Sequence, residues 1–165
     1  MPHRDQSADA IAALLDKNMT IAVAESLTGG LVTAELTSIP GASGAVVGGV
    51  VVYATELKNT LLGVDPELLA REGPVHPEVA RQLAVGVRER LAVGGKPADI
   101  GLATTGVAGP EPQGGRAVGT VYVGISVGAK TRVVDLIFSG DRESVRAQTL
   151  SRAISELCTE LGCVR

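Results

Sequence analysis

Three short runs of almost wholly apolar residues constrain the fold of this chain most. They are TIAVA at 20–24, VVGGVVVY at 46–53 and DIGLAT at 99–104. Strands that are apolar at consecutive rather than alternate positions are typical of a sheet that is covered on both faces. We therefore expect these runs to form strands that are buried on both faces, with helices above and below them.

The segments between these runs carry helical patterns. Helices are predicted at 7–17, 31–39, 54–62, 77–91 and 141–161. Two later strands, at 118–127 and 131–138, are separated by a turn at 128–130, which predicts a hairpin. Helices that alternate with strands, followed by a hairpin, indicate an α/β fold. We expect a three-layer α/β/α arrangement with a mixed β-sheet, as a single domain over residues 1–165.

Composition excludes several classes of function. Apolar residues make up 45% of the 165 residues, so a folded core is expected, but aromatic residues make up only 2%. Single-stranded nucleic acid needs aromatic faces on which to stack, and a phosphate backbone needs a basic surface, whereas this chain has a net charge of −3. We predict no nucleic-acid partner, no membrane partner and a cytoplasmic location with two reduced cysteine thiols.

Ser26 follows the first apolar run and precedes two glycines, in AESLTGG at 24–30. One interpretation is a helix N-cap, which needs only a side-chain oxygen before the helix. The other is a catalytic nucleophile, because Gly29 and Gly30 let a substrate approach the backbone and amides in the turn from Leu27 to Gly30 could hold an oxyanion. The local sequence leaves both interpretations open.

A serine nucleophile needs a general base. The chain has only two histidines, His3 near the terminus and His76 at the start of a predicted helix, where it resembles a capping residue. The other candidate is Lys58, which would have to lose its proton through burial or a nearby cation. Tyr53 ends the preceding strand and could relay a proton or orient the lysine. Taken alone, the local pattern also fits an exposed helical lysine and a half-buried tyrosine.

Two further segments could bind a substrate. TTGVAGP at 104–110 follows a buried strand, and hydroxyls and free amides at a strand end suit a phosphate or a sugar. Arg142, with Arg146 one helical turn later, could bind a phosphate in bidentate fashion. The alternatives are an ordinary glycine turn and solvated arginines after an N-cap Asp141. Neither segment matches the phosphate loop or the dinucleotide fingerprint, and no metal-ligand cluster is visible.

Taken in order, these segments resemble the C-terminal domain of the CinA family. The matching stretches are AESLTGG (24–30), PGAS (40–43), GGVVVYATELK (48–58), LLGVD (61–65), TTGVAGP (104–110), VGTVYVGI (118–125) and SGDRESVR (139–146). The resemblance covers nearly the whole chain. It implies an amidohydrolase that converts nicotinamide mononucleotide to nicotinate mononucleotide and ammonia.

The resemblance also implies roles for individual residues. The catalytic set would be Ser26, Tyr53 and Lys58. The residues implied around the substrate are Thr28, Gly29, Gly30, Thr105, Gly106, Gly109 and Arg142. No cofactor or metal is expected, the partner would be a small pyridine nucleotide, and homo-oligomerisation is left open. Departures from the family pattern at Leu27, Thr55 and His76 leave the substrate preference open.

A rival hypothesis from another class is a nucleotide-binding or regulatory module without catalysis, linked to competence or DNA damage. Such a module would share the pocket and would differ in what Ser26 does. It would bind nucleotide and release no ammonia.

Overall fold

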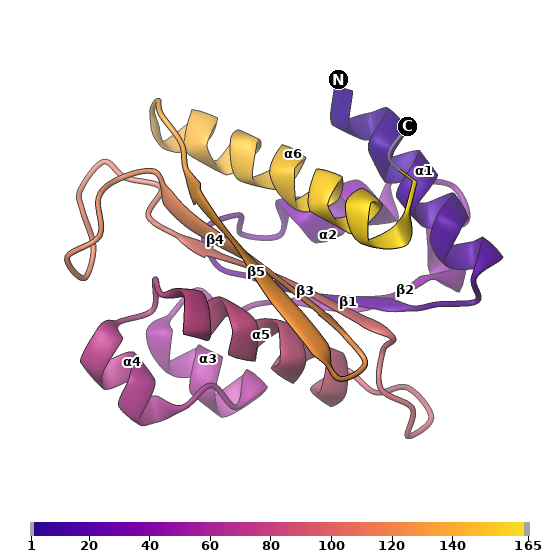
Figure 1. Cartoon of the computed structure of the whole chain (residues 1–165), viewed down its shortest axis with the longest axis horizontal. Helices are drawn as coiled ribbons and strands as arrows, with labels where there is room; N and C mark the ends of the chain where they lie inside the picture. Colours follow the sequence, from indigo (N-terminus) through magenta and orange to yellow (C-terminus); the bar gives the residue numbers. More distant parts are fainter. Residues whose placement is uncertain (1, 164–165) are drawn as a thin grey trace.

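A mixed β-sheet forms the middle layer of the computed structural model, which describes residues 2–163. Its strands are β1 (Ile21–Glu25), β2 (Val46–Val51), β3 (Ile100–Gly106), β4 (Thr120–Val127) and β5 (Lys130–Ile137). The order across the sheet is β2-β1-β3-β4-β5. Strand β1 is parallel to both of its neighbours, whereas the β3–β4 and β4–β5 pairs are antiparallel. The predicted hairpin is confirmed as β4 and β5 (Figure 1).

Helices cover both faces of this sheet. One face carries α1 (Pro2–Asp16), α2 (Leu31–Thr37) and α6 (Arg142–Leu161), and the other carries α3 (Thr55–Leu62), α4 (Pro66–Glu72) and α5 (Pro77–Arg90) (Figure 1). A short 3₁₀ helix, η1 (Ala42–Gly44), precedes β2. The predicted three-layer α/β/α fold with a mixed sheet is therefore confirmed. Among the described residues, no helix combines the length and the apolar character needed to cross a membrane.

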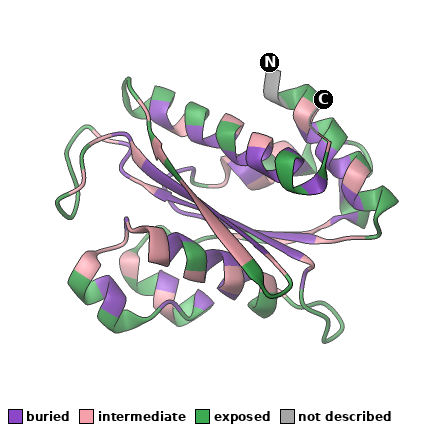
Figure 2. Cartoon of the chain, viewed as in Figure 1, coloured by how far each residue is buried: buried purple, intermediate pink, exposed green. Residues whose placement is uncertain are grey.

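Strand β1 shows why the sheet must be covered on both faces. Ile21 and Val23 belong to the apolar cluster formed with α1 and α6, and the alternate residues Ala22 and Ala24 belong to the cluster formed with α5. All four are fully buried. Figure 2 shows this burial along the central strands, with the exposed residues on the outer sides of the helices. Because successive side chains of a strand point to opposite faces, two covering layers are needed to bury all four of these residues.

Helix α5 packs against the sheet where two glycines face it. Gly101 on β3 and Gly124 on β4 lie opposite the helix backbone, and a Cβ atom at either position would overlap a carbonyl oxygen, that of Ala84 or Ala80 respectively. The glycines in these strands therefore serve close helix–sheet packing.

The prediction that 46–53 is buried on both faces is wrong. Strand β2 is an edge strand, and its residues are half-buried or exposed, with Val51 44% exposed. The strand also ends at Val51, two residues before Tyr53. An apolar run predicts a strand, but the position of that strand in the sheet depends on pairings with distant segments.

Helix α4 was not predicted. Asp65 caps it by accepting a hydrogen bond from the amide of Glu67, and Pro66 occupies its first turn. An Asp-Pro pair of this kind is a recognised helix start. The helix has only seven residues and buries only Leu68 and Leu69, so its periodicity is too short to be recognised.

The topology brings three segments to one edge of the sheet. Strands β1, β2 and β3 run parallel, so the residues that follow each of them lie at the same edge. These residues are 26–30 after β1, 52–54 after β2 and 107–109 after β3. Ligands of open α/β sheets bind at such carboxyl ends.

Candidate active site

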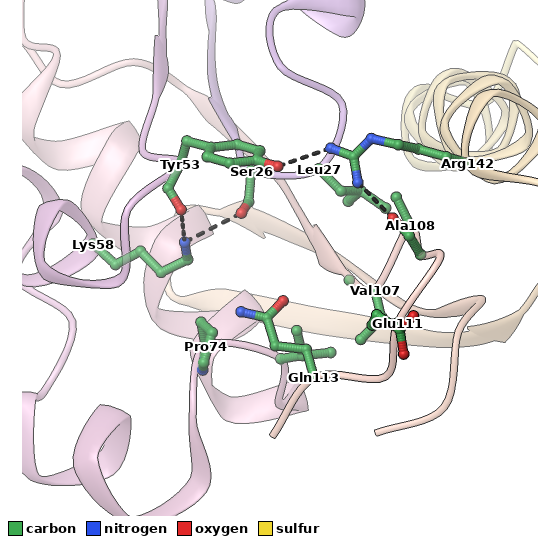
Figure 3. A pocket seen from close by; sticks show the side chains of 13 residues that line it. Ser26, Leu27, Tyr53, Lys58, Pro74, Val107, Ala108, Glu111, Gln113 and Arg142 are labelled. Atoms are coloured by element: carbon green, nitrogen blue, oxygen red, sulfur yellow. Dashed lines mark hydrogen bonds between the residues drawn. The ribbon is translucent and has the colours of Figure 1, made fainter. Parts of the chain in front are cut away.

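A pocket of about 130 Å³ lies at this edge of the sheet. The residues that line it are Ser26, Leu27, Tyr53, Lys58, Pro74, Val75, Gly106, Val107, Ala108, Gly109, Glu111, Gln113 and Arg142 (Figure 3). Pockets that enclose a whole drug-sized ligand are generally larger, about 300 Å³ or more. This pocket can therefore take the reacting end of a substrate, while the remainder extends past its rim.

Ser26 lies directly after β1, and only 8% of it is exposed. Its amide donates to the carbonyl of Thr104 at 3.1 Å, which continues the pairing of β1 with β3 for one more residue. Helix α2 begins at Leu31, and its N-cap is Gly30. The N-cap interpretation of Ser26 is therefore wrong, and its side chain is free to face the pocket.

The neighbouring Glu25 caps α2 in its place. Its fully buried carboxylate accepts hydrogen bonds from the amides of Gly30, Val32 and Thr33, at 3.0, 3.1 and 2.8 Å, and from the Thr33 hydroxyl at 2.7 Å. A buried carboxylate needs several such donors to offset the loss of hydration. Glu25 thus links the last residue of β1 to the start of α2 and closes the turn at 26–30 around Ser26.

This capping changes the expectation for the oxyanion. The Gly30 amide is bound to Glu25, and the Gly29 amide donates to the Ser26 carbonyl at 3.1 Å. Of the amides expected to hold an oxyanion, those of Gly29 and Gly30 are therefore already engaged. Within the described part of the chain, the amides of Leu27 and Thr28 have no hydrogen-bond acceptor. These two remain available, and the amide of the residue after a nucleophile is a common oxyanion donor.

Lys58 is the base candidate that the structure brings to Ser26. It lies on α3 and is fully buried, and its Nζ is 3.2 Å from the Ser26 Oγ. The same Nζ donates to the main-chain carbonyls of Val52 at 2.7 Å and Tyr53 at 3.3 Å. Burial lowers the pKa of Lys58 from 10.5 to about 8, because desolvation disfavours the charged ammonium.

These contacts suit an amine that acts as a base. A neutral amine has two hydrogens and one lone pair, and the Val52 and Tyr53 carbonyls can hold both hydrogens. The lone pair is then left for the proton of the Ser26 hydroxyl. At pH 7, a group with a pKa near 8 is neutral in about one molecule in ten. The pair can therefore work as a nucleophile and a general base near neutral pH.

Tyr53 is placed differently from the expectation. Its hydroxyl accepts a hydrogen bond from an Arg142 Nη at 2.8 Å, and the residue is 58% exposed. Toward Lys58 it offers its main-chain carbonyl only (Figure 3). Of the two roles left open for Tyr53, the contacts favour orientation of Lys58, through the Tyr53 main-chain carbonyl, over a side-chain proton relay, since Lys58 contacts Ser26 directly. The phenol lies at the rim of the pocket beside Arg142.

The two arginines of α6 have different positions. Arg142 is exposed and lines the pocket, where it donates to the Gly109 carbonyl at 2.8 Å as well as to Tyr53. Arg146 does not line the pocket and donates to two carbonyls of the Ser26 turn. Only Arg142 is placed to meet a ligand.

Of the remaining residues expected around the substrate, some line the pocket and others do not. Gly106 and Gly109 line the pocket. Thr28 and Thr105 are fully buried and do not line it. The Thr28 hydroxyl is bonded to that of Thr104, and the Thr105 hydroxyl donates to the carbonyl of Pro74 at 2.7 Å. None of Thr28, Gly29, Gly30 and Thr105 lines the pocket, so their direct contact with a substrate stays a prediction, and the Thr105 hydroxyl is instead bonded to the Pro74 carbonyl at the pocket wall.

Comparison with known proteins shows the relationship directly. Residues 4–161 match the family model of the CinA C-terminal domain. The chain belongs to the CinA C-terminal domain family. It is 48% identical over 146 residues to a CinA-like protein of Frankia casuarinae and 45% identical over 141 residues to one of Acidobacterium capsulatum. These matches cover 87% and 84% of this chain but 32% of each relative, so the chain spans about one third of their length.

Solved CinA structures share the fold over almost the whole chain. A CinA superfamily protein from Enterobacter cloacae matches with a TM-score of 0.90 and 31% identity, covering 96% of this chain and 92% of that one. The competence/damage inducible protein CihA from Agrobacterium tumefaciens matches with a TM-score of 0.90 and 28% identity, covering 98% and 96%. The resemblance to CinA inferred from the sequence is therefore confirmed.

Several pocket residues of this CinA domain were missed in the sequence. Glu111 and Gln113 lie in the loop after Gly109, and Figure 3 shows the Gln113 side chain reaching toward the pocket. These two residues could have been predicted as pocket residues, because they are polar and closely follow a glycine loop at the end of a strand. Of the departures from the family pattern, Leu27 lines the pocket, whereas His76 is the N-cap of α5, with Nδ1 accepting from the Glu78 amide.

The residues described here include no group of three or more His, Cys, Asp or Glu side chains arranged as metal ligands. Thr55 is the first residue of α3 and does not line the pocket. The ionisable side chains that line the pocket include Lys58 at its base, together with Arg142 and Glu111.

Proposed function

We propose that this chain hydrolyses the carboxamide of nicotinamide mononucleotide to nicotinate mononucleotide and ammonia, in the cytoplasm. The observation that carries the proposal is the buried Lys58 Nζ, 3.2 Å from the Ser26 Oγ at the base of a pocket. A lysine in this position supports an acyl-transfer reaction on serine. The family resemblance supplies the pyridine nucleotide as substrate.

The proposed reaction begins with neutral Lys58. It takes the proton of the Ser26 hydroxyl while Oγ attacks the carboxamide carbon. The tetrahedral oxyanion is held by the free amides of Leu27 and Thr28. Lys58, now an ammonium, gives the proton to the leaving nitrogen, the C–N bond breaks and ammonia departs. Water then attacks the acyl-serine with Lys58 as base, which releases nicotinate mononucleotide and restores Ser26.

The phosphoribosyl part is proposed to extend past the rim of the pocket. Arg142 is exposed there, and its guanidinium can exchange the Tyr53 hydroxyl and the Gly109 carbonyl for phosphate oxygens. Within the described residues, the amides of Ala108 and Gly109 also have no acceptor. Anchoring a remote group in this way orients the amide for attack.

Ammonia release by the purified chain tests this proposal. Nicotinamide mononucleotide should yield ammonia and nicotinate mononucleotide in equal amounts, without added metal or cofactor. Binding should be measured in parallel by calorimetry. A chain that binds the nucleotide but releases no ammonia from it or from another pyridine carboxamide would instead support the regulatory-module hypothesis.

Replacing Arg142 by Ala should weaken substrate binding more than it slows the reaction. Loss of a charged hydrogen bond costs about 1.5–3 kcal/mol, which corresponds to a rise in KM of about 10- to 150-fold, and kcat should stay within about fivefold. The measurement is steady-state kinetics on nicotinamide mononucleotide. Arg152→Ala, on the same helix but away from the pocket, is the control. An unchanged KM would exclude Arg142 as the anchor and would leave the Ala108 and Gly109 amides as candidates.

A further inference from the structure

Arg146 contacts the turn that carries Ser26 from outside the pocket. It lies on α6, four residues after Arg142, and is half-buried. Its Nε donates to the Leu27 carbonyl at 2.9 Å, and one Nη donates to the Thr28 carbonyl at 3.2 Å. One guanidinium from the last helix thus holds two consecutive peptide groups that directly follow the candidate nucleophile.

These bonds fix the orientation of the peptide planes. In a trans peptide the N–H points opposite to the C=O. With the Leu27 carbonyl held by Arg146, the amide of Thr28 must point away from Arg146. That amide is one of the two in the turn without an acceptor among the described residues. Arg146 therefore sets the direction of a proposed oxyanion donor without touching the substrate.

The far end of the turn is held independently. Glu25 binds the Gly30 amide, and the Gly29 amide closes onto the Ser26 carbonyl. Gly29 has a φ of +59°, and the Arg146 Nη lies 3.5 Å from where its Cβ would be. The turn is thus closed by internal bonds at one end. The Thr28 carbonyl accepts from the Leu31 amide at 3.2 Å as well as from Arg146, whereas the Leu27 carbonyl is held, among the described residues, by Arg146 alone.

The charge of Arg146 is also not neutralised by a carboxylate. Among the described residues, no Asp or Glu forms an ion pair with it, whereas Arg152 and Arg132 on the same side of the molecule are paired with Glu156. A half-buried guanidinium that binds only carbonyls leaves a positive potential beside the turn. This potential favours negative charge on a tetrahedral intermediate at Ser26.

We propose that Arg146 is a positioning residue that holds the Ser26 turn in its reactive geometry. This inference rests on the proposed function to the extent that Ser26 is the nucleophile. Arg142 and Arg146 of α6 then have different roles: Arg142 binds the substrate, and Arg146 holds the backbone behind the nucleophile.

The test compares Arg146→Met with Arg152→Met, which removes an arginine of α6 whose side chain, within the described residues, is bonded to Glu156 alone. A shift of about 1 Å in catalytic geometry can cost about 100-fold, so Arg146→Met should lower kcat by about 10- to 100-fold, with KM within about threefold. Amide hydrogen exchange in residues 26–30 should be faster than in Arg152→Met. Arg146→Lys, which restores one donor and the charge, should give an intermediate kcat.

A second readout does not depend on the amide substrate. Labelling of Ser26 by a fluorophosphonate, followed by intact mass, should be slower in Arg146→Met than in Arg152→Met. If the wild-type chain is labelled but releases no ammonia, the proposed function fails, and slower labelling together with faster exchange still supports positioning by Arg146. The inference is overturned if Arg146→Met keeps the kcat or the labelling rate of Arg152→Met, if exchange in 26–30 is the same in both, or if Ser26 of the wild type is neither labelled nor catalytic.

Discussion

The Ser26→Ala variant should release no ammonia above background from nicotinamide mononucleotide. Removal of the hydroxyl removes the acyl acceptor, and no other hydroxyl lines the base of the pocket beside Lys58 within the described residues. Loss of a serine nucleophile has cost a well-studied hydrolase about 10⁶-fold in kcat, and we expect a loss of about 10⁴-fold or more here. The measurement is ammonia release at equal concentrations of folded protein.

The structure separates this chemical loss from a loss of stability. Ser26 does not cap α2, since Gly30 is the N-cap and Glu25 binds the first amides of that helix. The variant should therefore keep its melting temperature within a few degrees and should still bind the nucleotide. Ser38→Ala, at the exposed end of the same helix, serves as the matched control. A Ser26→Ala variant that retains most of its turnover would show that the serine mechanism is wrong.

Much of the fold could be predicted because burial leaves a direct signature in the sequence. A strand covered on both faces must be apolar at consecutive positions, as β1 and β3 are, so three layers follow from the runs at 20–24 and 99–104. The parallel arrangement then places Ser26 and the loop after β3 at one edge. The exposure of β2 could not be predicted in this way, because an edge strand with small apolar residues has the same composition as a central one.

The site was less predictable than the fold, because its chemistry depends on which backbone amides already donate hydrogen bonds within the protein. The glycines at 29 and 30 do mark a tight turn, but whether their amides are free depends on the side chain of Glu25. A glutamate at the end of an apolar strand is the signal that could have revealed this, since a buried carboxylate needs donors close by.

The side-chain positions of Tyr53, Arg142 and Arg146 could not be predicted for a similar reason. Strand β2 ends two residues earlier than predicted, and the Tyr53 side chain turns outward to Arg142 while its carbonyl turns toward Lys58. Arg142 and Arg146 share one face of a helix by their spacing. Only the contacts of that face with the loops of β1 and β3 distinguish the ligand-facing arginine from the one behind the turn.

Lys58 should give the wild-type enzyme a distinctive dependence on pH. If neutral Lys58 is the base, kcat/KM should rise about tenfold per pH unit below the pKa of about 8 and level off above it. The free energy of unfolding should also depend on the ionisation of Lys58, over a different pH range. The pKa of Lys58 is lowered in the folded chain from 10.5 to about 8, so the unfolded chain binds more protons between these values. The free energy of unfolding should therefore gain a contribution that grows as the pH rises from about 8 to 10.5.

The Lys58→Met substitution should remove both the general base and the contribution of Lys58 to the pH dependence of unfolding. Turnover should fall by about 10³-fold or more at every pH, because the base that takes the serine proton and returns it to the leaving nitrogen is gone. The protonation penalty of about 3 kcal/mol below pH 8 is also removed, since one pKa unit corresponds to about 1.4 kcal/mol. Against this gain, the carbonyls of Val52 and Tyr53 lose a donor. These terms oppose each other, so the free energy of unfolding at pH 7 should change by no more than about 2 kcal/mol.

The decisive comparison is the unfolding of the wild type and of Lys58→Met by urea at pH 7, 8, 9 and 10. Other titrating groups are common to both proteins, so the difference between their free energies of unfolding isolates Lys58. That difference should shift in favour of the wild type as the pH rises above about 8. Lys17→Met, which changes an exposed lysine just after α1, should show no such shift. A pH-independent difference, or a Lys58→Met variant with wild-type turnover, would exclude Lys58 as a buried base and would leave the activation of Ser26 unexplained by this pocket.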